Sequence, residues 1–161
     1  MPLAAPVPGL EPAFTVDARL GPLEDHGMTR AGHRRVVPVT GGRVSGLPGA
    51  QLRLDAEILP GGADWQIVRP DGTVEIDTRY SARTADAEYV HFRTLGVRSG
   101  PPAVLEALLR GEAVDPARYY FRVTVYLETS APRLTPLERS VYVASAVRGA
   151  DSVAYTAYRV T

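Results

Sequence analysis

Short runs of alternating apolar and polar residues recur along most of the chain, and glycine or proline ends nearly every run. In residues 14–20 every second residue, from Phe14 to Leu20, is apolar, and Gly21-Pro22 follows. Period two is typical of a half-buried β-strand, because successive side chains point to opposite faces of a sheet. The same pattern predicts strands over residues 33–40, 51–59, 65–69, 73–80, 88–95, 119–129, 140–148 and 152–160.

One segment departs from this period. In residues 101–110, Val104, Leu105 and Leu108 recur at helical spacing, and Gly111 stands where a C-terminal cap belongs. We therefore expect one short helix among about nine strands. Many short strands with glycine and proline turns favour an all-β fold, a single closed antiparallel β-barrel. Pro38 predicts an edge position or a bulge, because proline has no N–H to donate to a ladder.

The length of 161 residues suits one domain. Residues 1–12 are rich in proline and alanine and lack periodicity, so we expect a flexible N-terminal arm followed by a single barrel domain over residues 13–161. The N-terminus lacks the basic and apolar regions of a signal peptide, and no apolar run is long enough to cross a bilayer. We expect a cytoplasmic, soluble protein with no membrane partner.

The composition excludes several kinds of chemistry. Cysteine is absent, which excludes thiol nucleophiles and disulfides, and all 18 Lys+Arg residues are arginine, which excludes a lysine Schiff base. The formal net charge is zero and the signs are interspersed, so nucleic acid is not an expected partner. No pair of histidines has metal-ligand spacing, and we expect neither a metal nor a cofactor.

Residues 59–80 concentrate the candidate site residues. Asp71-Gly72 predicts a hairpin turn between the runs 65–69 and 73–80. On the second run, period two puts Tyr80 on one face and both Asp77 and Arg79 on the other. Arg79 is therefore a candidate for binding an anionic oxygen, with a surface ion pair as the alternative.

Asp64 follows a glycine pair, where positive φ can aim a side chain away from the regular strand direction. It is either a general acid or base at the mouth of the barrel or a turn residue that accepts backbone N–H bonds. Trp65 is either a core residue or part of the ligand-binding surface. His91, in the middle of its strand, is either a structural histidine or a ligand contact.

The run 120–129 has an apolar face and a polar face. The polar face carries Arg122, Tyr126 and Glu128. A barrel wrapped by other segments can place apolar packing outside the sheet and leave a polar lumen. In that arrangement Arg122 and Glu128, too far apart along the strand to pair, would flank a bound molecule.

Several fragments together resemble the domain-of-unknown-function 3237 family, also called UPF0311, of small β-barrel proteins. These fragments are Gly61-Gly62-Ala63-Asp64-Trp65, Arg69-x-Asp71-Gly72, Asp77-x-Arg79-Tyr80, Tyr120-Phe121-Arg122, Leu127-Glu128-Thr129 and Tyr155-x-x-Tyr158. The resemblance implies one antiparallel barrel with a ligand-sized interior, without an activity shared by all members. Its members usually carry an aromatic-Leu-Asn-Arg run where this chain has Pro136-Leu137-Glu138-Arg139, which implies a different ligand.

The preferred hypothesis is a cofactor-free acid–base enzyme, of isomerase, cyclase or lyase type, that acts on a small carbonyl-bearing or polyketide-like metabolite. The predicted catalytic residues are Asp64, Arg79 and Glu128. The predicted ligand-binding residues are Trp65, Asp77, Tyr80, His91, Arg122, Tyr126 and Arg139. The alternatives are a non-catalytic carrier or sensor of small ligands and a purely structural module. A homodimer and a monomer both remain open.

Overall fold

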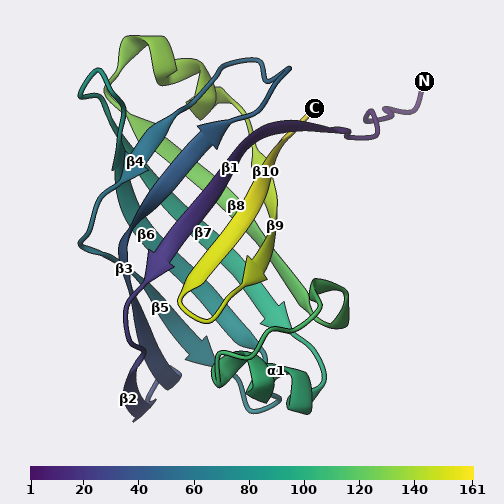
Figure 1. Cartoon of the computed structure of the whole chain (residues 1–161). Helices are drawn as coiled ribbons and strands as arrows, with labels where there is room; N and C mark the ends of the chain where they lie inside the picture. The colour runs from purple at the N-terminus through teal and green to yellow at the C-terminus, as the bar shows by residue number, and fades with distance from the viewer.

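The computed structural model describes residues 1–161 and is a closed antiparallel β-barrel, as the alternating pattern predicts (Figure 1). Its strands are β1 (Leu10–Leu20), β2 (Glu24–Thr29), β3 (Gly32–Gly46), β4 (Ala56–Ile58), β5 (Gly62–Val68), β6 (Val74–Arg83), β7 (Tyr89–Ser99), β8 (Tyr120–Thr129), β9 (Tyr142–Arg148) and β10 (Ser152–Val160). The helices are α1 (Pro102–Leu109) and two 3₁₀ segments, η1 (Pro116–Arg118) and η2 (Pro132–Arg139).

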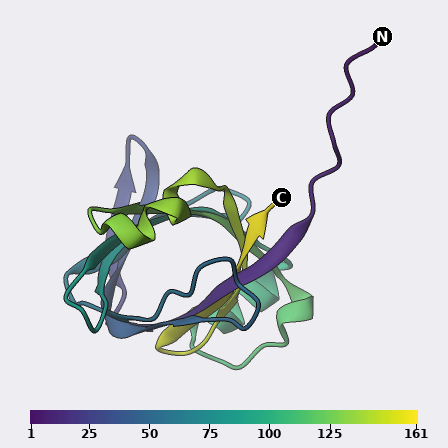
Figure 2. The ribbon, with the colours of Figure 1, turned by 90° about the horizontal axis from the view of Figure 1, so that it is seen from above.

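Eight strands close the barrel in the order β1, β10, β9, β8, β7, β6, β5, β3, and β3 returns to pair with β1. β3 is long enough to contact β5 and β2 with its first half and β1 and β4 with its second half. Seen from above, the strands form a ring, and the N-terminal segment before β1 extends away from it (Figure 2). Closure leaves no long unpaired edge, which explains why this sequence of hairpins is stable as one sheet.

One end of the lumen is filled by an apolar core. Phe14 contacts Phe92 with ring centroids 6.0 Å apart and Tyr142 at 5.9 Å. Leu54 and Leu134, both fully buried, come from the connection before β4 and from η2. The open part of the lumen therefore lies toward the opposite end, where α1 is found (Figure 1).

The structure differs from the sequence analysis in three places. Of the strand predicted over residues 51–59, only β4 forms, because Leu54 turns inward to fill the end of the barrel rather than continuing a ladder. β2 was not predicted, since its sequence has no alternating pattern and its residues are mostly exposed. η2 was not predicted either, because its two prolines indicate a loop. Burial of Leu134 and Leu137 holds the segment in place.

Pro38 occupies the kind of position that its missing N–H requires. It pairs with Ala63 of β5 on one side. On the other side it lies in a gap between two pairings of β3, because the pairing with β2 extends only to Val36 and the pairing with β1 starts at Val39. No helix in the structure is long and apolar enough to cross a membrane.

Candidate functional site in the barrel lumen

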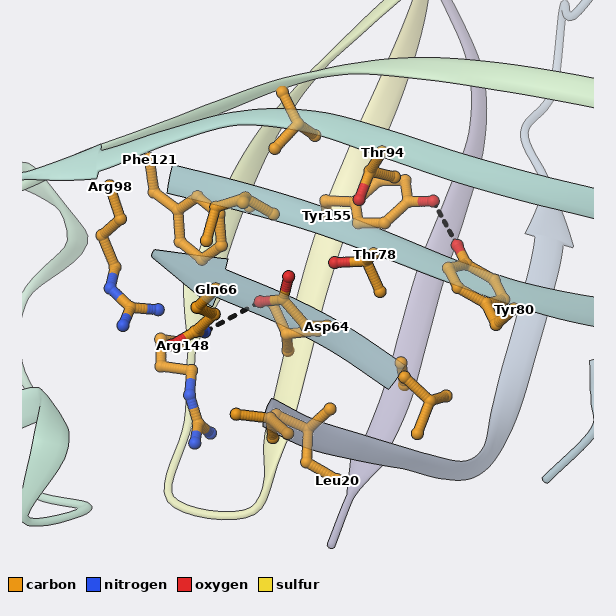
Figure 3. A pocket seen from close by; sticks show the side chains of 17 residues that line it. Leu20, Asp64, Gln66, Thr78, Tyr80, Thr94, Arg98, Phe121, Arg148 and Tyr155 are labelled. Atoms are coloured by element: carbon orange, nitrogen blue, oxygen red, sulfur yellow. Dashed lines mark hydrogen bonds between the residues drawn. The ribbon is translucent and has the colours of Figure 1, made fainter. Parts of the chain in front are cut away.

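The start of β5 is shaped by two glycines with different roles. Gly61 has φ +108°, a conformation that favours glycine, and its position is otherwise open. A Cβ at Gly62 would collide with the backbone of Arg79 and Tyr80. The pair therefore turns the chain and brings β5 close to β6, which directs Asp64 into the lumen (Figure 3).

Asp64 is held where the ladder between β5 and β6 is interrupted. Pairing runs through Asp64↔Thr78 and resumes at Ile67↔Glu75, so that Trp65 and Gln66 have no partner on β6. The N–H of Asp77 donates instead to Oδ1 of Asp64, at 3.1 Å. The carboxylate thus replaces a backbone acceptor, which fixes its orientation.

The Asp64 side chain is buried, with only 8 % of the residue exposed. Burial raises the pKa of this carboxyl above its ordinary value, and the hydrogen bonds from Gln66, Thr78 and the Asp77 N–H act in the opposite direction. The net rise means that the protonated form is favoured more than in water. A carboxyl of this kind can accept and return a proton near neutral pH more readily than an exposed aspartate.

A polar relay connects Asp64 to Arg35. Nε2 of Gln66 donates to Oδ2 of Asp64 at 2.8 Å, and Oε1 of Gln66 accepts from Nη2 of Arg35 at 3.1 Å. All three side chains are buried. The charge of the carboxylate is therefore balanced through the amide rather than by a direct ion pair.

Two further arginines enter the lumen from the α1 end. Arg98, at the end of β7, is 6 % exposed and lies over the ring of Phe121, with 5.4 Å between its Cζ and the ring centroid. Arg148, at the end of β9, donates through Nη1 to the carbonyls of Gly149, Ala150 and Ser152 in its own turn. Figure 3 shows both guanidinium groups on the same side of Asp64.

The opposite side of Asp64 carries a pair of tyrosines. The hydroxyls of Tyr80 on β6 and Tyr155 on β10 are hydrogen-bonded to each other across the lumen (Figure 3). Burial raises the pKa of both phenols, so both stay protonated at neutral pH. One hydroxyl donates to the other, and the accepting hydroxyl keeps a hydrogen that can be donated to a ligand.

These side chains surround a cavity of about 40 Å³, in which Thr78 and Thr94 add further hydroxyls. Most of its lining is apolar and comes from β1, β3, β6, β8, β9 and β10. The cavity is small and largely enclosed. It suits a compact molecule.

Several predicted site residues lie together, but on the outer face of the barrel. Arg79, His91, Tyr126 and Glu128 line a broad, open depression across β6, β7 and β8. Asp77 lies beside them, with Nε of Arg93 3.1 Å and Nε of Arg79 3.7 Å from its Oδ1. This open surface is separated by the sheet from the lumen that contains Asp64 and Tyr80.

The expectation that Arg122 and Glu128 flank a molecule in the lumen is wrong. The apolar face of β8, with Phe121 and Val123, points inward to the core and the cavity, so the polar face points outward. The reason is the packing of η2, α1 and the N-terminal strand, which leaves this outer face of β8 uncovered and available for charged residues. Arg122 lies outside, over the ring of Tyr120 at 5.3 Å.

The remaining two predicted residues are also distant from the cavity. Trp65 is 39 % exposed on the outer face of β5, and its carbonyl accepts from Nη1 of Arg34 at 3.0 Å. Arg139 ends η2, at the opposite end of the barrel from Arg98. Of the ten predicted site residues, the structure places Asp64 and Tyr80 in the lumen.

The lumen residues that the sequence analysis missed follow the same two-residue period. Arg35 lies on the same strand face as Val37 and Val39, and Arg148 lies on the same face as Ala144 and Ala146. Applying the two-residue period to the whole of each predicted strand, Arg35 near the start of one and Arg148 at the end of the other, would have found both. A charged residue at the end of an apolar face is easily taken as the point where the strand leaves the core.

Fold and site together define a small antiparallel barrel with a buried, mostly apolar pocket at one end of its lumen, into which Asp64 and two arginines project. The chain belongs to the DUF3237 family of proteins of unknown function, whose family model matches residues 8–160.

Among its relatives, the UPF0311 protein blr7842 of Bradyrhizobium diazoefficiens is 37 % identical over 147 residues, covering 91 % of this chain and 93 % of the relative. A solved structure, the conserved protein of unknown function RPA1785 from Rhodopseudomonas palustris, superposes with a TM-score of 0.88 at 36 % identity. That alignment covers 98 % of this chain and 100 % of the other. A structure described as an enzyme from Penicillium herquei shares the fold, with a TM-score of 0.70 at 17 % identity and full coverage of both chains.

Proposed function

We propose that the protein is an acid–base enzyme that moves a proton on a compact, carbonyl-bearing molecule bound in the lumen. The observation that carries this proposal is the position of Asp64, a buried carboxyl that lines the cavity and whose pKa is raised by burial. Buried carboxyls with raised pKa values in clefts are frequent sites of proton transfer. Isomerisation, cyclisation and elimination all begin with such a step.

In the proposed step the Asp64 carboxylate takes the proton from the carbon next to the carbonyl. The electron pair of the broken C–H bond forms the C=C bond of an enolate, and the carbonyl π electrons move to the oxygen. The Tyr80–Tyr155 pair, on one side of Asp64, supplies a hydroxyl hydrogen to that oxygen. When the substrate has a C=C bond next to the deprotonated carbon, return of the proton from Asp64 to the far carbon of that bond completes an isomerisation and restores the carboxylate.

The test is hydrogen exchange in D₂O, followed by NMR, on compact carbonyl compounds with slow spontaneous exchange: cyclopentanone, butanone, pyruvate and 2-oxobutyrate. We expect the wild-type protein to accelerate exchange on at least one of them and Asp64→Asn to lose at least about 100-fold of that acceleration. Asp17→Asn, the same chemical change on the exposed face of β1, is the matched control. Exchange that is unaffected by Asp64→Asn contradicts the proposal.

A carrier of small ligands is the second candidate, since eleven of the seventeen residues around the cavity are hydrophobic and suit retention of an apolar molecule. Binding of a probe without accelerated exchange on any of the four compounds supports the carrier.

A further inference from the structure

Arg98 is a buried cation without a hydrogen-bond partner in the protein. Its Nε is inaccessible to solvent and unpaired, and none of its other N–H groups donates to a protein acceptor. A guanidinium has five N–H donors, and burying them unpaired costs free energy. Arg98 lies over the face of Phe121, and no hydrogen bond in the protein occupies the edge of its guanidinium plane.

The nearby charges do not neutralise Arg98. Asp64 is connected to Arg35 through Gln66, and Arg148 has the carboxylate of Asp151 in its own turn. The carboxylates of Asp25, Asp64 and Asp151 act on these arginines from a distance, but none of them forms an ion pair or a hydrogen bond with Arg98. Burial lowers the pKa of Arg98 to about 10, and Arg148 acts in the same direction, so Arg98 still carries its charge at neutral pH.

The guanidinium of Arg98 lies at the wall of the cavity. Arg98 is opposite Phe121 in the register between β7 and β8, and Ala146, one inward position before Arg148 on β9, lines the same wall. Both arginines and Asp64 line the one cavity of about 40 Å³. An anion there has apolar surface on one side and guanidinium donors on the other.

We propose that Arg98, with Arg148 beside it, binds the carboxylate of a compact monoanionic ligand in the lumen. Arg98 has no hydrogen-bond partner in the protein, and a planar carboxylate accepts two parallel hydrogen bonds from a guanidinium edge. The apolar lining takes the rest of the molecule. This inference rests on the function proposed above, because it makes the substrate a carbonyl-bearing acid whose carboxylate lies at the arginine end and whose reacting carbon lies next to Asp64.

The test measures binding of acetate, butyrate and benzoate by calorimetry, each against its neutral amide and with inorganic phosphate as a further arm. We expect at least one carboxylate to bind the wild-type protein more tightly than its amide and than phosphate. Arg98→Met, which replaces the cation by an apolar side chain of similar length, should weaken that carboxylate at least about tenfold and leave the amide unchanged. Arg118→Met, an exposed arginine of η1 near the same end of the barrel, is the control.

The result overturns the proposal if no carboxylate binds better than its amide, if phosphate binds more tightly, or if Arg98→Met binds the carboxylate as the wild type does. Failure of the subsite is distinguishable from failure of the proposed function. Asp64→Asn should lose exchange and retain carboxylate binding, whereas carboxylate binding that depends on Arg98 supports the subsite even if no compound undergoes exchange.

Discussion

The side-chain amide of Gln66 donates a hydrogen bond of 2.8 Å to the carboxylate of Asp64. The two residues are neighbours on the inner face of β5, at the point where β5 has parted from β6. This contact orients the buried carboxylate. The same amide accepts a hydrogen bond from Arg35, so Gln66 connects the carboxylate to that guanidinium. Arg98, in the same cavity, is the buried cation without a hydrogen-bond partner.

The stability of the protein should depend on pH through Asp64. Its pKa in the folded state is raised by burial, so the native state holds the proton more tightly than the unfolded chain does. Native stability is therefore lost as pH rises from about 3.9, the ordinary aspartate value, through the raised pKa. Asp64→Asn lacks this loss.

The measurement is urea unfolding of wild type and Asp64→Asn at pH 4 and pH 8. The free energy of unfolding of the variant should rise relative to wild type by about 1.4 kcal/mol for each unit by which the pKa is raised. A difference between variant and wild type that is constant with pH would contradict a raised pKa.

Removing both hydroxyls of the tyrosine pair should cost less than the sum of the two single removals. Tyr80→Phe or Tyr155→Phe leaves the other buried hydroxyl unpaired, which costs about 1–3 kcal/mol of unfolding free energy. The double variant leaves no unpaired group and should be closer to wild type than the sum of the single variants. Strict additivity in this double-mutant cycle would show that the hydroxyls do not interact.

Arg98→Met should stabilise the fold by about 1–3 kcal/mol, because it removes a buried, unpaired cation and keeps the volume. Thermal unfolding of the ligand-free protein measures this gain. Arg118→Met, on the exposed surface, should lie within about 0.5 kcal/mol of wild type. Destabilisation by Arg98→Met would mean that the guanidinium is paired in solution.

The two glycines before Asp64 should respond differently to alanine. Gly61→Ala meets open space and pays only for positive φ, about 1 kcal/mol. Gly62→Ala forces a Cβ into the backbone of Arg79 and should cost more than about 3 kcal/mol. Chemical unfolding of both variants gives the comparison, and equal costs would exclude the close approach of β5 and β6.

The inward and outward faces of β6 were predictable because a strand alternates strictly, and Tyr80 was assigned to the face opposite Asp77 and Arg79 on that basis. The helix near residue 105 and the hairpin at Asp71-Gly72 were predictable from local spacing and turn residues. Alternation assigns residues to two faces without saying which face is the lumen. For β8 the wrong face was chosen, since the position of η2 and α1 depends on contacts distant in the sequence.

The sequence by itself determined the class of fold, the number of faces on each strand and the exclusion of cysteine and lysine chemistry. Local rules suffice for these, because alternation, turn residues and composition act within a few residues. Only the tertiary structure decided that Arg98 and Arg148 meet Asp64 in one cavity while Arg79, Arg122 and Glu128 stay outside. Barrel closure joins strands far apart in the chain, and burial then sets the charge balance and the pKa of the residues inside.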